Sequence, residues 1–160
     1  LQPLTIGRKP RFARLIDVAC NLADMCWHEH SDMRGDLAAR RVLGLPVNCI
    51  THKERIWLAT VLYHRYVGLK QNKPHPEEMD SLLRTKRRAE ALTVGLALRF
   101  ALIFSAGTCD YLKNIRLECL PDLMKLHIDP SARGLFDAHC QRRFVDFAAT
   151  AKCRAEVIYD

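Results

Sequence analysis

The sequence predicts a mainly α-helical domain, a helical bundle with one small β-hairpin near the C-terminal part of the chain. Apolar residues recur every three to four positions through most of the first 110 residues and again near the end, whereas a period of two appears in residues 111–129. The chain has 160 residues, 49% apolar and 27% charged, enough for one domain with its own core. We therefore predict a single domain over 1–160: a helical bundle over 1–110, a hairpin over 111–129 and a terminal helix over 130–160 that packs back on the bundle.

The first predicted helix begins near Phe12, and apolar residues keep helical spacing from there to Cys26, over more than three turns. Residues 27–36, WHEHSDMRGD, are polar and rich in turn formers, so the chain is expected to bend there. A weaker helical pattern follows through residues 37–43. Pro46 ends it, because proline cannot continue a helix.

The third predicted helix begins at a capping box. Thr51 supplies a hydroxyl oxygen for the amide three residues later, and Glu54 supplies a carboxylate that reaches back. The apolar residues that follow surround most of the helix, which is typical of a helix buried on several sides, and the helix ends near Gly68. After a loop, the Pro-Glu-Glu of residues 76–78 suits the first turn of a further helix.

The most apolar predicted helix follows the basic residues 86–88 and runs to about Ser105. It has almost no polar face, so it must lie at the centre of the bundle. Arg99 lies within it, where a guanidinium is costly unless it is paired or extends to water. We expect a carboxylate, Asp17 or Asp24, to be its partner.

Beyond Asp110 the apolar period changes from helical to two. Residues 115–119 and 124–128 alternate apolar with polar or charged side chains on either side of the turn at 121–122, which is typical of a β-hairpin. Residues 136–151 return to helical spacing and predict the terminal helix.

The charge balance favours a polyanionic partner. The chain has 25 basic and 18 acidic residues, a net charge of +7, which attracts polyanions and releases their counterions on contact. Aromatic residues do not interleave with the basic ones as in proteins that stack single-stranded bases, so a nucleic acid is not the expected partner. The longest apolar run, residues 92–106, is too short to cross a bilayer, so no membrane is expected either.

The sequence lacks the motifs that several kinds of site require. The seven cysteines are odd in number and lie mostly in apolar helical segments, which indicates reduced thiols and a cytoplasmic location. There is no C-x2-C or H-x3-H pair, so we expect no metal site. There is also no G-x-S-x-G and no glycine-rich phosphate loop, so we predict no catalytic residue. The chain opens LQPLTIGRKP, without an initiator Met or a signal peptide, and we expect it to be the C-terminal part of a longer chain.

One polar stretch carries a recognisable motif. Residues 22–35 read LADMCWHEHSDMRG, and LYHR follows at 62–65 and LRFA at 98–101. These segments resemble the C-terminal, HD-like helical domain of the exopolyphosphatase and guanosine pentaphosphate phosphohydrolase family. Members of that family read close to LADxxWxxHPDYRG, then YxRH or YHR, then LRLA. The resemblance spans most of the chain.

The resemblance implies an accessory domain, inactive alone, that follows an actin-like, sugar-kinase-type catalytic region. In the family that region holds the phosphate-binding loops, the catalytic acid and a divalent metal, expected to be Mg²⁺, and removes terminal phosphates from inorganic polyphosphate. The C-terminal domain contributes to dimerisation and to a basic surface for the substrate. The implied partners are therefore polyphosphate, the chain's own N-terminal catalytic region and a second copy in a homodimer, with no cofactor in this domain. The choice between polyphosphate and guanosine pentaphosphate stays open.

The chain departs from the metal-binding pattern of HD phosphohydrolases. Their His-Asp pair matches Ala23 and Asp24 here, and their later Asp matches Leu102. Alkyl groups cannot donate lone pairs to a metal, so we expect a dismantled site in which Asp24 partners a basic residue. Two alternatives are kept: a metal-dependent HD phosphohydrolase that acts on nucleotides, and a non-catalytic helical interaction module.

Four residues at positions that match the family are candidates for binding polyphosphate: Arg34, His64, Arg65 and His30. An arginine can direct two hydrogen bonds onto one phosphate, and a protonated histidine adds positive charge. For each of them a surface ion pair or a helix cap is an equal alternative.

Overall fold

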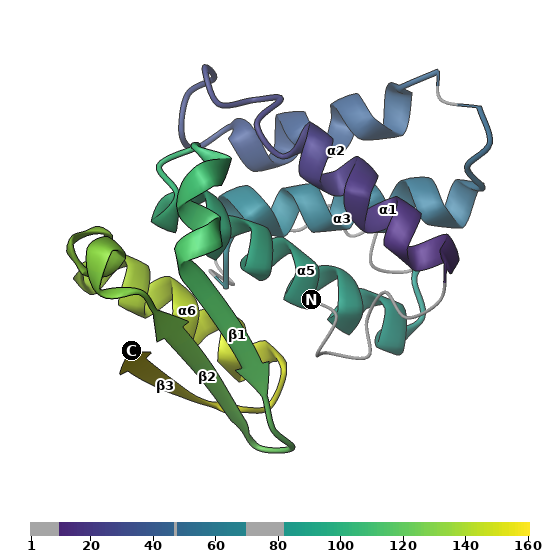
Figure 1. The fold of residues 1–160 in the computed structure, drawn as a ribbon. Coiled ribbons are helices and arrows are strands. Elements are labelled where there is room, and N and C mark those ends of the chain that lie inside the picture. The colour runs from purple at the N-terminus through teal and green to yellow at the C-terminus, as the bar shows by residue number, and fades with distance from the viewer. Residues whose placement is uncertain (1–9, 47, 70–81) are drawn as a thin grey trace.

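A computed structural model gives the structure of residues 10–46, 48–69 and 82–160 (Figure 1). The fold is mainly helical with a small three-stranded sheet near the C-terminal end, which confirms the predicted class. The predicted helix start at residues 76–78 lies outside the described residues. The α-helices are α1 (Pro10–Leu22), α2 (Arg34–Gly44), α3 (His52–Val67), α5 (Thr85–Phe104) and α6 (Ala138–Thr150). The other elements are two 3-10 helices (Cys109–Asn114 and Pro130–Leu135) and the strands β1 (Ile115–Cys119), β2 (Leu123–Ile128) and β3 (Arg154–Tyr159).

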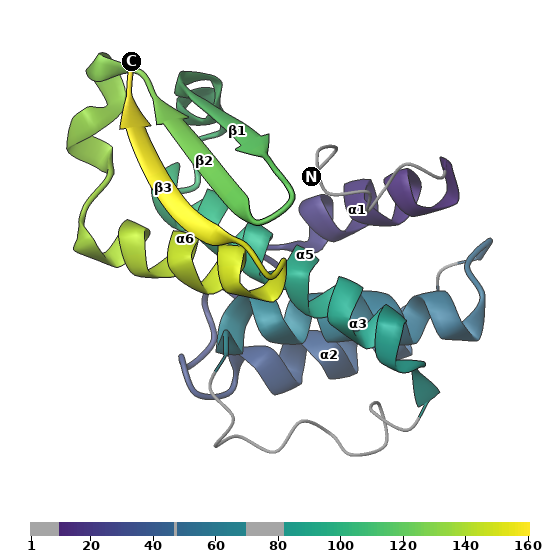
Figure 2. The ribbon, with the colours of Figure 1, turned by 90° about the horizontal axis from the view of Figure 1, so that it is seen from below.

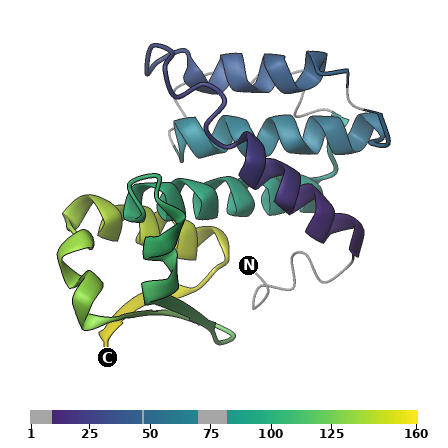
Figure 3. The ribbon, with the colours of Figure 1, turned by 45° about the horizontal axis from the view of Figure 1, so that its top comes forward.

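Helices α2, α3 and α5 lie one on the next, with α3 in the middle and α1 crossing them (Figure 3). Because α3 contacts helices on several sides, its residues from Ile56 to Tyr63 are all buried. The prediction that this helix is buried on several sides is therefore confirmed.

Helix α5 joins the two halves of the core. One face of it, with Ala91, Val94 and Leu98, packs with α1, α2 and α3, whereas another, with Leu96, Phe100 and Phe104, packs with α6 and the sheet. A helix that contacts partners on opposite sides along its length needs apolar residues all round. This confirms its predicted central position.

The chain leaves α1 earlier than predicted. The apolar pattern runs to Cys26, but the α-helix ends at Leu22 and successive turns follow. Ala23 and Cys26 are nevertheless buried. The Cys26 N–H donates to the hydroxyl oxygen of Tyr66 on α3, at 3.1 Å, so a tertiary bond replaces the next helical one.

The predicted hairpin is present, and β2 lies at the centre of the sheet (Figure 2). Strands β1 and β2 pair antiparallel, with Leu117 opposite Leu126. Alternate residues of β2, from Met124 to Ile128, are fully buried against the second half of the core, as the period of two requires.

The prediction of a terminal helix over 130–160 is wrong in its last part. Helix α6 ends at Thr150, the backbone turns through Lys152 at φ +61°, and β3 then runs parallel to β2. Parallel strands need a crossover between them, and α6 provides it. The strand gains its hydrogen bonds from β2, a partner distant in sequence.

None of the helices in the described part of the chain is long and apolar enough to span a membrane.

The six cysteines whose side chains the structure describes are free thiols. Burial raises the pKa of Cys26, Cys119 and Cys140, so these thiols stay protonated at neutral pH.

The capping box at the start of α3 is formed as predicted. The Thr51 N–H donates to the Glu54 carboxylate at 2.7 Å, and the Glu54 N–H donates to the Thr51 hydroxyl at 3.3 Å. Arg11 of α1 adds an Nε–H donation to the same carboxylate at 2.6 Å. The bond from Arg11, helped by those from Thr51, lowers the pKa of Glu54 to about 2.

Glu54→Gln is expected to lower the free energy of unfolding at pH 7 by about 1–2 kcal/mol, because the charge-assisted bonds are lost. The pKa of Glu54 is lower in the folded state than its ordinary value of 4.5, so its stabilisation is complete above pH 4.5 and disappears as the pH falls toward 2. Urea denaturation at several pH values measures this. The wild type and the variant should converge over that window, and a constant difference down to pH 2 would contradict the assignment. Asp110→Asn, at an exposed ion pair with Lys113, is the control and should change little.

Candidate functional site

A cavity of about 480 Å³ opens between the segment after α1, the C-terminal ends of α3 and α5, and α6. Its lining includes two carboxylates, those of Asp24 and Asp32, and four guanidinium groups. The charge of the lining is therefore positive. The guanidinium groups belong to Arg34, Arg65, Arg99 and Arg143, and we call this the four-arginine cavity.

Arg65 is held in place by its neighbours. It lies in the last turn of α3, donates from Nη2 to an Asp24 carboxylate oxygen at 2.6 Å, and stacks 4.0 Å above the centre of the Tyr66 ring. The Tyr66 hydroxyl in turn accepts from the Cys26 N–H. Burial raises the pKa of Tyr66, so this hydroxyl stays neutral at physiological pH. These contacts fasten the segment after α1 to the end of α3.

Arg99 is paired with no carboxylate among the described residues, and the prediction of Asp17 or Asp24 as its partner is wrong. Its Nη1 donates to the backbone oxygen of Arg65, at 3.1 Å, and to that of Tyr66. Carbonyls in the last turn of a helix lack intrahelical partners and lie at the negative end of its dipole, so they attract a cation. Asp24 pairs with Arg65 instead, which confirms that it partners a basic residue.

The arginines lie close enough to affect one another. Burial, and then the charges of Arg143 and Arg65, lower the pKa of Arg99 to about 10. The group remains protonated at neutral pH, since that value is far above 7. The cavity therefore holds like charges that repel one another in a partly dehydrated space.

Some of the hydrogen-bonding capacity of these arginines is unused. The Nε atoms of Arg65, Arg99 and Arg143 are buried, and none has a hydrogen-bond partner in the described part of the chain. Buried donors without partners are uncommon in folded proteins. An anion in the cavity could accept from these donors and also reduce the repulsion, so the arrangement is chemically suited to an anion.

Arg34 is anchored differently. Its Nε donates to the backbone oxygen of Glu29 at 2.8 Å, across the bend that precedes α2. Gly35, the next residue, packs against α3 so closely that an added Cβ would lie 2.5 Å from a Val67 methyl carbon. The motif segment thus presses the start of α2 against α3 and brings Arg34 to the cavity.

A family model described as exopolyphosphatase, C-terminal, matches residues 5–158. The chain belongs to this family. No curated protein matches the chain.

Membership confirms the resemblance to an exopolyphosphatase C-terminal domain that the motifs indicated. An exopolyphosphatase C-terminal domain is an accessory domain of an exopolyphosphatase-type protein, and the parent is expected to be a hydrolase with a separate catalytic region. The family is matched over almost all of the chain, including the residues that line the four-arginine cavity.

The structure brings two of the four predicted site residues of this exopolyphosphatase domain together. Arg34 and Arg65 both line the cavity. His64 is not part of its lining; it is half-buried, and its ring meets that of Tyr63 edge-on at 5.4 Å. His30 is exposed beside the cavity, where its Nδ1 accepts from the Asp32 N–H at 3.3 Å.

Two of the four arginines of the cavity, Arg99 and Arg143, were not predicted as site residues from the sequence. The sequence predicts Arg99 only as a buried charge in need of a partner, and it does not single out Arg143. The signal was present for Arg99, because an arginine inside an almost wholly apolar helix must point toward something polar. Arg143 had no such signal.

The positions that resemble HD metal ligands can also be located. Asp24 and Leu102 line the four-arginine cavity. Ala23, the residue before Asp24, is buried. Among the residues that the structure describes, no three His, Cys, Asp or Glu side chains lie close enough to hold a metal ion. The charged groups that line the cavity are the guanidinium groups of the four arginines and the carboxylates of Asp24 and Asp32.

Proposed function

We propose that this domain is a non-catalytic accessory domain that binds inorganic polyphosphate in the four-arginine cavity on behalf of the parent exopolyphosphatase. The observation that carries the proposal is the set of buried, unpartnered Nε–H groups on Arg65, Arg99 and Arg143, which surround one cavity. Polyphosphate supplies closely spaced anionic oxygens that can accept from all of them.

The arrangement suits a phosphate chain better than a single carboxylate. The arginines come from three different helices, α3, α5 and α6, with Arg34 at the start of α2. Guanidinium groups on several walls can contact successive phosphates, and each can direct two hydrogen bonds at one phosphate. Asp24 and Asp32 neutralise part of the charge and so reduce the repulsion among the arginines.

We also propose that the cavity corresponds to the metal-binding centre of an HD-like fold. Asp24 and Leu102 both face it, and Leu102 and Ala23 have no donor atoms. In this proposal the divalent metal and the catalytic acid belong to the parent's catalytic region. Dimerisation and contributions from His30 and His64 remain predictions that the resemblance suggests, and a cytoplasmic location remains a prediction from the cysteines.

The test is binding of fluorescently labelled long-chain polyphosphate, followed by fluorescence anisotropy at two salt concentrations. If about four phosphates are neutralised, affinity should fall roughly 50- to 150-fold between about 50 and about 200 mM salt. No binding at low salt would contradict the proposed role, and release of phosphate from polyphosphate by the chain alone would contradict its non-catalytic part.

Two neighbouring arginines on α6 provide a matched pair of variants. Arg143 lines the cavity, whereas Arg142 is exposed and lies outside its lining. Arg143→Gln is expected to weaken polyphosphate binding about tenfold, the typical effect of losing one charge-assisted contact. Arg142→Gln removes the same charge and should change the affinity less than threefold, roughly the effect of a screened surface charge. Equal losses of affinity in the two variants would show that polyphosphate binding depends on net charge and not on the cavity.

A further inference from the structure

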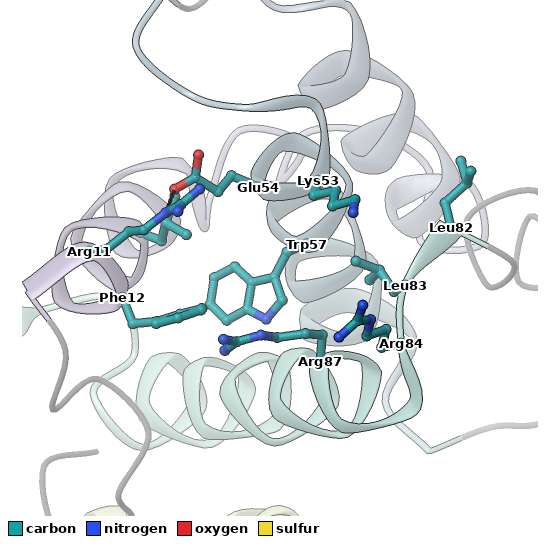
Figure 4. Close-up of a pocket in the computed structure, with 10 residues that line it drawn as sticks. Arg11, Phe12, Lys53, Glu54, Trp57, Leu82, Leu83, Arg84 and Arg87 are labelled. Carbon is teal, nitrogen blue, oxygen red and sulfur yellow. Dashed lines mark hydrogen bonds and ion pairs between the residues drawn. The ribbon is translucent and has the colours of Figure 1, made fainter.

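A second cavity, of about 370 Å³, lies at the opposite ends of α3 and α5 and shares no lining residue with the four-arginine cavity (Figure 4). It opens where α1, α3 and α5 begin, and we call it the Trp57 pocket. Its inner wall is apolar: Leu15 and Trp57 are almost completely buried, and the Phe12 ring meets the Trp57 ring edge-on at 6.0 Å.

The indole of Trp57 has an unused donor. Trp57 is only 2% exposed, and its Nε1 has no hydrogen-bond partner within the described residues. Buried indole N–H groups usually find an acceptor. Figure 4 shows this nitrogen on the edge of the ring that faces Arg84 and Arg87. An acceptor atom brought into the pocket would satisfy it.

The rim of the pocket has basic side chains that differ in whether they are paired. Arg87 stacks on the Phe12 ring at 3.9 Å and is paired with Glu90. Lys53 and Arg84, in contrast, have no ion-pair partner in the parts of the chain that the structure describes, although both line the pocket.

The first turn of α5 adds to this field. Arg84 is its N-cap residue, no side chain caps the turn, and the turn contains no acidic residue. The N–H groups of a helix start lack intrahelical partners and carry the positive end of the dipole. An anion at this place would meet the helix start, Arg84 and Lys53 together.

We propose that the Trp57 pocket binds a small organic anion that carries an aromatic ring. The ring packs on the apolar wall of Phe12 and Trp57, and the anionic group lies between Arg84 and Lys53, with one oxygen accepting from the Trp57 Nε1–H. This nitrogen is shielded from water in the structure, so the long, partly exposed side chains of Arg84 and Arg87 move aside as the ligand enters. Polyphosphate has no apolar part, which separates this site from the four-arginine cavity.

The test uses the two indole N–H resonances of the chain in a ¹H–¹⁵N spectrum, one from Trp57 and one from the exposed Trp27. Phenyl phosphate should shift the Trp57 resonance saturably and leave that of Trp27 in place. Inorganic phosphate, the anion without the ring, should bind at least about tenfold more weakly, because no apolar surface is buried. Trp27→Phe assigns the two resonances without touching the pocket.

Arg84→Gln should weaken the binding of phenyl phosphate about tenfold, since one charge-assisted contact is lost, while Arg142→Gln on distant α6 should leave it unchanged. Three results would each overturn the proposal: no saturable shift at Trp57, equal affinity for inorganic phosphate, or no effect of Arg84→Gln. The polyphosphate measurement on the Arg84→Gln variant keeps the two sites distinct, because failure of the Trp57 pocket leaves that binding intact.

Discussion

Gly95→Ala is expected to lower the free energy of unfolding by about 2 kcal/mol, although alanine favours helix more than glycine does by about 1 kcal/mol. The reason is the close approach of α5 to α3. An added Cβ would lie 2.6 Å from the backbone oxygen of Val61 and 2.8 Å from the Cβ of His64. Neither atom belongs to the free end of a flexible side chain, so the two helices must separate.

Gly44→Ala is the matched control, because an added Cβ at the end of α2 meets nothing within 4 Å. Its free energy of unfolding should change by less than about 0.5 kcal/mol. Urea denaturation of both variants measures the difference. Equal stability of the Gly95 variant and the wild type would contradict the tight contact between α3 and α5. Because Arg65 and Arg99 lie on these two helices, the Gly95 variant should also bind polyphosphate less tightly.

Arg99→Met is expected to weaken polyphosphate binding by about ten- to a hundredfold. The side chain is fixed by two carbonyl oxygens of α3, and its buried Nε is one of the unpartnered donors of the cavity. Stability should change by only about 1 kcal/mol, since losing these bonds is opposed by the relief of burial and of repulsion from Arg65 and Arg143.

The control is Arg116→Met, which removes the same charge from an exposed position on β1. Affinity measured by anisotropy and stability measured by urea denaturation should be compared for both variants. If Arg99→Met binds polyphosphate as tightly as Arg116→Met does, the cavity is not the binding site. A large loss of stability would show instead that Arg99 is chiefly a structural link between α3 and α5.

Patterns within one or two turns of chain predicted the regular elements well. The capping box of Thr51 and Glu54 starts α3, and Gly68, at φ +76°, ends it. The hairpin over β1 and β2 likewise follows from the alternation of neighbouring residues. Caps, turns and periodicity depend on residues that are close in sequence, and for this reason the sequence is sufficient to predict them.

Elements that depend on distant partners were predicted less well. Strand β3 forms because β2 offers it an edge, and the only local signal for it was the short run Val157-Ile158-Tyr159 of residues that favour strands. The end of α1 is set by the bond from Cys26 to Tyr66, 40 residues further on. Arg99 was expected to need an acceptor, but only the packed helices show that this acceptor is the end of α3.

The helical class, the positive charge and, through the motif at residues 22–35, the family of the chain could all be predicted from the sequence. It also indicated two members of the cavity, Arg34 and Arg65. That Arg99 and Arg143 line the same cavity, and that His64 does not, follows from how α3, α5 and α6 pack together. The physical reason is that charges act on one another through space and through the polarity of their surroundings, and neither is set by separation along the chain.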